Sequence, residues 1–226
     1  EDKADIWWDE SQGKWAGYDV PDFGGTKPPY APDGQDAYIM RPEGVGCIYS
    51  AVGDGPLPEH YEPWESPTKN PLSSVQLNPV TKIWDPPMND KGDVSRFPYV
   101  GTTYRVSEHW QTGSMTRNLS WLSELMPYMY AEIGEDLARE KGIKNGDKVR
   151  VSSARGEIEC YALVTKRMKA QDVNGQKVHH VGLPWHYGYS GIATGAIANH
   201  LTPHIGDANT MIPEYKAFLV DIRRVG

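Results

Sequence analysis

Polar side chains crowd into residues 103–118, the stretch TYRVSEHWQTGSMTRN. Two arginines, Arg105 and Arg117, flank a turn centred on Gly113. Guanidinium groups bind phosphate through paired hydrogen bonds, and backbone N–H groups near a glycine can approach an anion closely. The stretch is also too polar for a core strand. It therefore predicts a site for a large, polar, anionic ligand, without indicating a reaction.

Two later stretches carry further candidate ligand-binding groups. Residues 185–191, WHYGYSG, place aromatic rings beside a histidine and glycines, which suits either stacking on a flat heterocycle or an ordinary packed turn. Asn199, Asp207 and Asn209 carry paired donors and acceptors that could read the edge of a purine or pterin. Lys216 is a candidate to neutralise a phosphate, although a solvated lysine is the commoner situation.

Composition limits the classes of partner. The net charge of −7 argues against nucleic acid or an anionic membrane as the main partner, because both need a basic surface. No run of about 18 apolar residues occurs, so we expect no transmembrane segment. The 23 glycines and 18 prolines indicate much irregular backbone.

The cysteines and histidines do not form a metal-binding pattern. Cys47 and Cys160 could pair, but iron–sulfur clusters generally need four thiolates. Cys160 lies in an alternating apolar stretch, which predicts a buried, inert thiol. His200 and His204 are separated by Pro203 and cannot share a helix face. We therefore expect no metal site built from side chains of this chain.

The chain divides at about residue 98. Residues 1–98 are dense in Pro, Gly, Asp and Trp and show no helical periodicity. We interpret them as an extended, irregular arm whose Trp and Tyr side chains dock into a partner protein, because so long a structureless stretch is unusual within a compact domain. The alternative is a disordered tail. Residues 99–226 have the pattern of a folded domain.

Short strands dominate this second part. Residues 148–153 and 157–165 alternate and predict a hairpin. Its candidate inner face comprises Val149, Val151, Ile158, Cys160 and Leu163. Further strands are expected at 178–183 and 217–223, and short helices at 120–124 and 132–141. The second helix carries acids early, Lys141 late and Gly142 after its end. The absence of a βαβ alternation predicts a mainly β fold, a barrel with short helices.

Four stretches resemble, in order, the C-terminal part of the catalytic subunit of formate dehydrogenases. These enzymes belong to the molybdopterin oxidoreductase superfamily of the dimethyl-sulfoxide-reductase type. The stretches are GTTYRVSEHWQTGSMTRN, GIKNGDKVRVSSARGEIECYALVTKR, GLPWHYGY and LTPHIGDANTMIPEYKAFLVDIRRV. In the arm, DGPLPEHYEPWESP is similar to the segment that precedes this domain in periplasmic and membrane-associated formate dehydrogenases.

The resemblance implies a double-psi β-barrel of the aspartate-decarboxylase-like type. It also implies a ligand, the bis(molybdopterin guanine dinucleotide) complex of tungsten or molybdenum. The positions that match cofactor-contacting residues of the family are Thr103, Tyr104, Arg105, His109, Trp110, Gln111, Thr112, Gly113, Ser114, Met115, Trp185, His186, Tyr187, Asn199 and Lys216.

The chain also departs from the family. The four-cysteine cluster motif is absent, and so is the cysteine or selenocysteine that ligates the metal. We therefore expect neither a catalytic residue nor a metal ligand in this chain, and 4Fe–4S clusters only in partner chains. The chain would be a separately encoded, cleaved or C-terminal piece of a larger subunit. Its expected partners are the remaining N-terminal part of the catalytic subunit and an iron–sulfur electron-transfer subunit.

The expected reaction is the two-electron oxidation of formate to carbon dioxide, or its reverse. One alternative is a nitrate-reductase-like molybdoenzyme, because HWQTGSMT resembles that branch too. Another is a non-catalytic double-psi barrel that serves assembly. The resemblance favours the periplasm, with the cytoplasm as the alternative.

Overall fold

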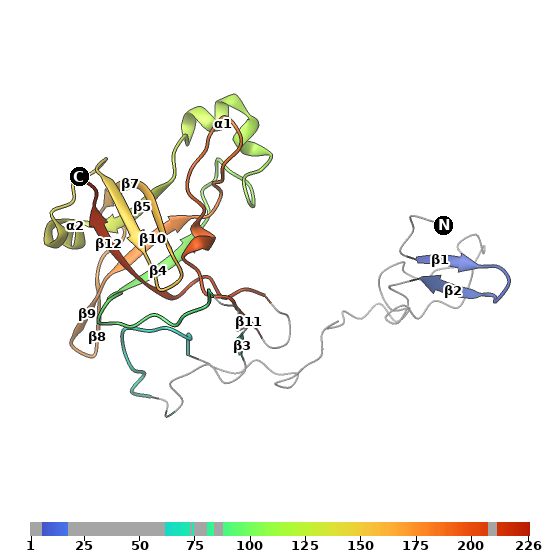
Figure 1. The fold of residues 1–226 in the computed structure, drawn as a ribbon, viewed down its shortest axis with the longest axis horizontal. Helices are drawn as coiled ribbons and strands as arrows, with labels where there is room; N and C mark the ends of the chain where they lie inside the picture. The colour runs from blue at the N-terminus through green and yellow to red at the C-terminus, as the bar shows by residue number, and fades with distance from the viewer. Residues whose placement is uncertain (1–5, 18–61, 73, 75–80, 84–87, 208–211) are drawn as a thin grey trace. The chain divides into compact units, whose positions relative to one another are not determined.

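The computed structural model divides the chain into two compact units, Glu1–Gly53 and Asp54–Gly226 (Figure 1). It describes residues 6–17, 62–72, 74, 81–83, 88–207 and 212–226.

A β-hairpin is the described part of the first unit. It pairs β1 (Ile6–Asp9) antiparallel with β2 (Lys14–Gly17). Trp8 and Trp15 meet edge to face, with ring centroids 5.7 Å apart. Such an aromatic pair across a hairpin stabilises it. The Pro- and Gly-rich composition of the arm hid this hairpin from the sequence prediction.

The second unit contains a closed six-stranded barrel in the order β10-β4-β12-β6-β7-β5. Two parallel pairs, β10 with β4 and β5 with β7, lie on either side of the antiparallel pairing of β5 with β10, and all other neighbours are antiparallel. This confirms the predicted mainly β, double-psi barrel. The strands are β4 (Tyr99–Tyr104), β5 (Tyr130–Gly134), β6 (Lys148–Ser152), β7 (Glu157–Thr165), β10 (His180–Pro184) and β12 (Phe218–Arg224).

Large apolar side chains fill the barrel. Ile133, Leu183, Phe218 and Ile222 are fully buried. Gly101 makes room for the Phe218 ring, because a Cβ there would lie 2.5 Å from a ring carbon. A closed barrel without strand edges and with a packed interior provides a rigid support for the loops at its ends.

The hairpin of β6 and β7 confirms the predicted pair of strands. Ile158 and Cys160 are buried, as expected, but Leu163 is only partly buried. Ala162 takes the inward position instead, because strict alternation from Ile158 continues through residue 162. Leu163 lines a surface groove with Tyr128.

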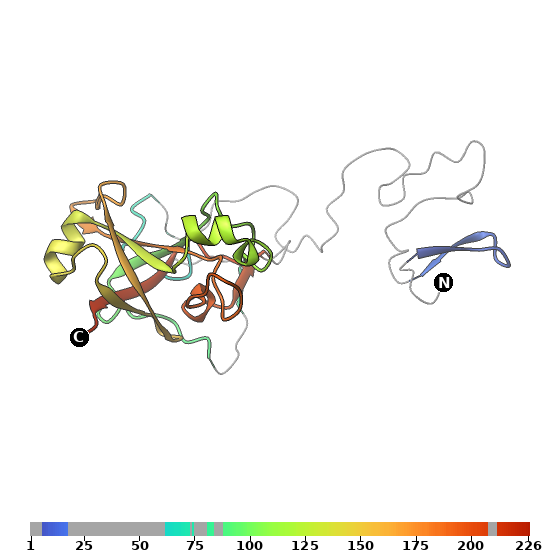
Figure 2. The same cartoon turned by 90° about the horizontal axis from the view of Figure 1, so that it is seen from above.

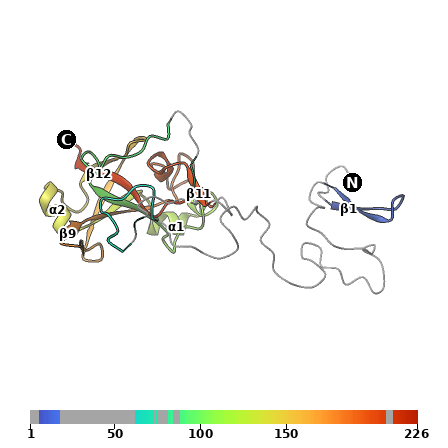
Figure 3. The ribbon, with the colours of Figure 1, turned by 90° about the horizontal axis from the view of Figure 1, so that it is seen from below.

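Two helices flank the barrel and lie well apart in Figure 1, Figure 2 and Figure 3. The helix predicted at 120–124 is confirmed as α1 (Ser120–Leu125). The second helix, α2 (Glu135–Lys141), begins three residues later than predicted, because residues 132–134 belong to β5 and pair with β7 and β10. The end was predicted correctly, since Gly142 adopts φ 64 and its N–H donates to the last turn.

Smaller elements complete the described part. Strand β8 (Gln171–Val173) pairs antiparallel with β9 (Gln176–Val178), and β3 (Thr81–Ile83) pairs antiparallel with β11 (Ile205–Asp207). No helix among the described residues is long and apolar enough to cross a membrane. The 3-10 helices are η2 (Thr116–Asn118) and η3 (Ala198–His200).

A buried ion pair fastens the arm to the barrel. The side chains of Glu65 and Arg155 are 0% and 4% exposed, and Arg155 Nη2 donates to Glu65 Oε2 at 3.1 Å. The backbone N–H groups of Gly92 and Leu219 also donate to Glu65. Arg155 donates in addition to the carbonyl of Leu201 at 2.8 Å. This Glu65–Arg155 junction joins two segments of the arm to the β6–β7 turn, β12 and the end of η3.

The predicted boundary at residue 98 stays a prediction. The contact-based division falls at Gly53, and the junction shows that described arm residues beyond it pack on the barrel.

Candidate functional site

The C-terminal end of β4 brings together three of the predicted residues. The N–H and the hydroxyl of Thr103 donate to the carbonyl of Tyr215 at 3.1 and 3.0 Å. Lys216 Nζ donates to the carbonyl of Thr103. Burial lowers the pKa of Lys216, and the positive charge of Arg105 lowers it further. Two cationic groups therefore converge where β4 ends.

Arg105 lies on an aromatic platform. Its guanidinium carbon is 5.3 Å from the centroid of the Trp185 ring, and Nη2 donates to Gln111 Oε1 at 3.4 Å. Arg105 is exposed and forms no ion pair with a carboxylate of the described residues. Its remaining donors are thus available to a phosphate oxygen.

The turn that follows depends on close backbone approach. Gly113 has φ 77, and a Cβ there would lie 2.0 Å from the carbonyl oxygen of His186. Gln111 also adopts a positive φ, 52. A side chain at position 113 would push the turn away from the segment that carries Trp185 and His186. The two predicted stretches are therefore held together by a position that requires glycine.

His186 fixes this turn as a neutral ring. The N–H of Val106 donates to Nε2 at 2.9 Å, so the proton sits on Nδ1, which donates to the carbonyl of Gln111. Burial is the main cause that lowers the pKa of His186. His109 and Arg105 lower it further, and the bond to Gln111 opposes them. Both ring nitrogens are hydrogen-bonded to the backbone, so His186 holds the segment between Val106 and Gln111 in place.

His109 forms a second buried support. Its Nε2 donates to the carbonyl of Met126 at 2.9 Å, and its Nδ1 lies 3.2 Å from the hydroxyl of Thr116. That hydroxyl accepts from the N–H of Trp110, so its own proton points to His109. The Tyr187 hydroxyl donates to the same Met126 carbonyl at 3.0 Å. The polar atoms of these side chains are thus satisfied within the chain.

Arg117 differs from Arg105 in its surroundings. It is buried, and Nη1 donates to the carbonyl of Ser190, whereas Nε has no hydrogen-bond partner among the described residues. Its carbonyl accepts from the Ser123 hydroxyl at 3.0 Å. Arg117 therefore connects residues 103–118, which we call the donor-rich loop, with residues 188–190 and with α1.

The outer face of the loop mixes donors and apolar groups. Gln111, Thr112 and Ser114 are exposed, and the Thr112 hydroxyl donates to that of Ser114 at 3.4 Å. Trp110 and Met115 are each 60% exposed. This composition suits a ligand that has both polar edges and flat rings.

Tyr104 faces a different cluster. Its hydroxyl donates to Glu132 at 2.7 Å, and Thr165 and Arg167 Nε donate to the same carboxylate at 2.8 and 2.9 Å. Burial is the first cause that raises the pKa of Tyr104. Although burial alone would raise it, the bonds from Arg167, Tyr104 and Thr165 lower the pKa of Glu132. The helix prediction over residues 132–134 concealed this buried carboxylate.

Asn199 forms no hydrogen bond with the loop among the described residues. It sits on η3 and is exposed, and its carbonyl accepts from the Thr202 hydroxyl at 3.3 Å. Asp207 ends β11, and Asn209 lies outside the described residues.

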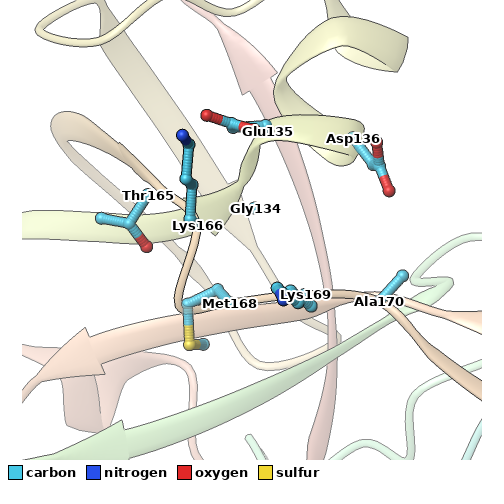
Figure 4. A pocket seen from close by; sticks show the side chains of 8 residues that line it. All are labelled: Gly134, Glu135, Asp136, Thr165, Lys166, Met168, Lys169 and Ala170. Atoms are coloured by element: carbon cyan, nitrogen blue, oxygen red, sulfur yellow. The ribbon is translucent and has the colours of Figure 1, made fainter.

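Two cavities relate differently to these residues. A hollow of about 440 Å³ is lined by Lys216 together with Pro63 of the arm and Asp207. A second hollow, of about 360 Å³, lies between the start of α2 and residues 165–170, where Figure 4 shows Lys166 and Glu135 at its wall. None of the predicted site residues lines this second hollow.

The described residues offer no metal site. No group of three or more His, Cys, Asp or Glu side chains among them could hold a metal ion. Cys160 is free and buried, and burial raises its pKa to about 12, as expected for an inert thiol. Cys47 lies outside the described part of the chain.

Comparison with known proteins shows which proteins this chain is similar to. The formate dehydrogenase subunit alpha of Megalodesulfovibrio gigas is 47% identical over 99% of this chain and 22% of its own length. The nitrate-inducible formate dehydrogenase major subunit of Escherichia coli K12 is 48% identical over 97% of this chain and 21% of its own length. A nitrate reductase of Symbiobacterium thermophilum is 27% identical over 85% of this chain and 21% of its own length. The chain thus spans about a fifth of the length of these relatives.

The family described as "Molydopterin dinucleotide binding domain" matches residues 99–219. That range begins with β4 and includes the donor-rich loop, the Trp185 segment and Lys216. Because the match covers more than half of the chain, this chain belongs to the family of molybdopterin dinucleotide-binding domains.

Proposed function

We propose that this chain is the C-terminal, cofactor-binding part of the catalytic subunit of a formate dehydrogenase. The whole enzyme would oxidise formate to carbon dioxide and two electrons, or catalyse the reverse. Support comes from two formate dehydrogenase subunits that are 47% and 48% identical over nearly the whole chain, against 27% for the nitrate reductase.

The convergence of Arg105 and Lys216 carries the proposal. Burial lowers the pKa of Lys216 most, and the positive charge of Arg105 lowers it further. An anion placed between these two cations would relieve their repulsion. The pyrophosphate of a dinucleotide is such an anion, and Gly113 permits close backbone approach. The residues present therefore fit the phosphate-bearing part of a bis(molybdopterin guanine dinucleotide).

The chain's own residues would bind and orient this group. The tungsten or molybdenum complex supplies the two-electron redox chemistry when bound. Arg105, held flat on Trp185, would bind phosphate, and Gln111, Thr112 and Ser114 would donate to polar edges. His186, neutral and hydrogen-bonded on both nitrogens, would keep the turn in place.

The remaining components would come from elsewhere. The metal ligand and 4Fe–4S clusters would lie in the remaining N-terminal part of the catalytic subunit and in an iron–sulfur electron-transfer subunit. Buried Cys160 supports this division, because a thiol whose pKa is raised to about 12 does not readily supply a thiolate. We propose the periplasm as the compartment.

Purification of the native complex tests the proposal. We expect tungsten or molybdenum by elemental analysis, pterin by the fluorescence of its oxidised derivative, and formate-dependent dye reduction. A complex that contains pterin but reduces nitrate and ignores formate would favour the nitrate-reductase-like alternative. Formate-dependent dye reduction by the isolated 226-residue chain would contradict the proposed division of labour.

A further inference from the structure

Exposed apolar side chains gather around α1. Six large ones lie between residues 110 and 128, and each is at least 53% exposed. The most exposed is Trp121, at 82%. We call this surface the α1 patch; it comprises Trp110, Met115, Leu119, Trp121, Leu125 and Tyr128. So dense a cluster of apolar side chains is uncommon on the free surface of a soluble protein and marks an interaction site.

Helix α1 buries a polar residue and exposes apolar ones, the reverse of the usual pattern. The helix has six residues, and its buried member is Ser123, whose hydroxyl donates to the carbonyl of Arg117. Trp121 and Leu125 lie four residues apart, on one helix face, and point away from the barrel core. Isolated helices this short are unstable, and most take their stability from burial of the apolar face. The exposed face of α1 therefore lacks the cover that would stabilise it.

A groove continues the patch. It encloses about 600 Å³ and is lined by Met126, Tyr128, Tyr161 and Leu163, among others. The Tyr128 and Tyr161 rings have centroids 5.5 Å apart and form an aromatic wall. This groove can accept several apolar side chains of a partner, as the buried centre of a protein interface requires.

We propose that the α1 patch and this groove bind the remaining part of the catalytic subunit. This inference rests on the proposed function. The chain accounts for 21–22% of the length of its relatives, so a large polypeptide must meet this domain in the whole enzyme. Trp110 and Met115 belong both to the patch and to the donor-rich loop. A partner that covers the patch therefore also closes over the loop that would hold the cofactor.

Hydroxyl-radical footprinting tests the proposal. The native complex and the isolated chain are oxidised in parallel, and oxidation is quantified by mass spectrometry. Oxidation of Trp121 should fall roughly tenfold in the complex if an indole that is 82% exposed becomes buried. A reference peptide added to both samples normalises the radical dose. Equal oxidation of Trp121 in both samples would overturn the proposal.

Further outcomes separate the possible occupants. Trp121 protection in the isolated chain that grows with chain concentration would assign the patch to a second copy. Protection on addition of phosphatidylglycerol vesicles would assign it to a membrane, and either result overturns the proposal. Cross-links from residues near Trp121 to the remaining catalytic polypeptide would support it.

The same samples distinguish this inference from the proposed function. Protected Trp121 in a complex without pterin or formate activity would contradict the function and leave the interface standing. Accessible Trp121 in a complex with pterin and formate activity would contradict the interface alone.

Discussion

The Glu65–Arg155 junction and the donor-rich loop each contain an arginine, but the guanidinium group is buried and paired in the first and exposed and unpaired in the second. At the junction, a carboxylate and a guanidinium are buried and satisfied by each other and by backbone groups. In the loop, Arg105 is exposed, lies over Trp185 and forms no ion pair within the described residues. A buried, fully paired charge indicates a structural role, whereas an exposed, unpaired one on a rigid support indicates a ligand.

The largest expected effect comes from breaking the junction. Glu65→Ala leaves Arg155 buried without its partner, which costs about 3–5 kcal/mol of the free energy of unfolding. Urea denaturation followed by tryptophan fluorescence measures it. The control is Asp136→Ala, which removes exposed ion pairs with Arg139 and Lys177 and should cost under about 1 kcal/mol. Equal costs for the two variants would show that the junction is not structurally important.

A second prediction concerns the turn that places the donors. Gly113→Ala combines a positive φ with a clash against the His186 carbonyl. Gly146→Ala has φ 84 but no atom within 4 Å of its new Cβ, so it is the matched control. We expect Gly113→Ala to be less stable than the control by about 1–3 kcal/mol, the usual cost of overpacking. Pterin content should also fall in the first variant and not in the second.

If both variants unfold at the same urea concentration and retain pterin, the approach of the turn to His186 is not needed to form the site.

A third prediction uses the other buried carboxylate, Glu132. Burial alone would raise its pKa, but hydrogen bonds from Arg167, Tyr104 and Thr165 hold it below the ordinary 4.5. A carboxyl with a lowered folded pKa adds stability above its unfolded pKa and loses it as the pH falls through the folded value. The stability advantage of the wild-type chain over Glu132→Gln should therefore shrink as the pH falls from about 7 to about 3.

Urea midpoints at each pH measure this difference. Glu124→Gln, an exposed change on α1, is the control and should run parallel to the wild type. A wild-type advantage over Glu132→Gln that is constant across the pH range would contradict the assigned ion-pair network.

The sequence predicted what local patterns determine. The hairpin of β6 and β7 follows from alternation and its turn, and the end of α2 follows from Gly142. The start of α2 was wrong, because residues 132–134 have helix-compatible local chemistry and only long-range pairing with β7 and β10 makes them a strand.

The candidate site shows the same limit. The loop around Gly113 was recognisable because its donors are adjacent in sequence. The junction was not, since Glu65 and Arg155 are 90 positions apart and neither lies in a motif. Likewise, no local signal separates Arg105 from Arg117, and only the tertiary structure shows that the first is exposed and the second buried.

The smallest effect on stability should come from the residue most important for the ligand. Arg105→Ala removes an exposed side chain, so the free energy of unfolding should change by no more than about 0.5 kcal/mol. Loss of a charged hydrogen bond to phosphate costs about 1.5–3 kcal/mol of binding, which weakens cofactor retention about tenfold or more. Pterin and metal content after extended dialysis of the complex measure this loss.

Arg139→Ala, which removes an exposed arginine on α2, is the control and should retain both pterin and metal. Unchanged pterin in Arg105→Ala would remove the distinction between the two regions, because Arg105 would then be a surface charge without a ligand. Loss of pterin without loss of stability would separate the ligand-binding arginine from the structural one, Arg155.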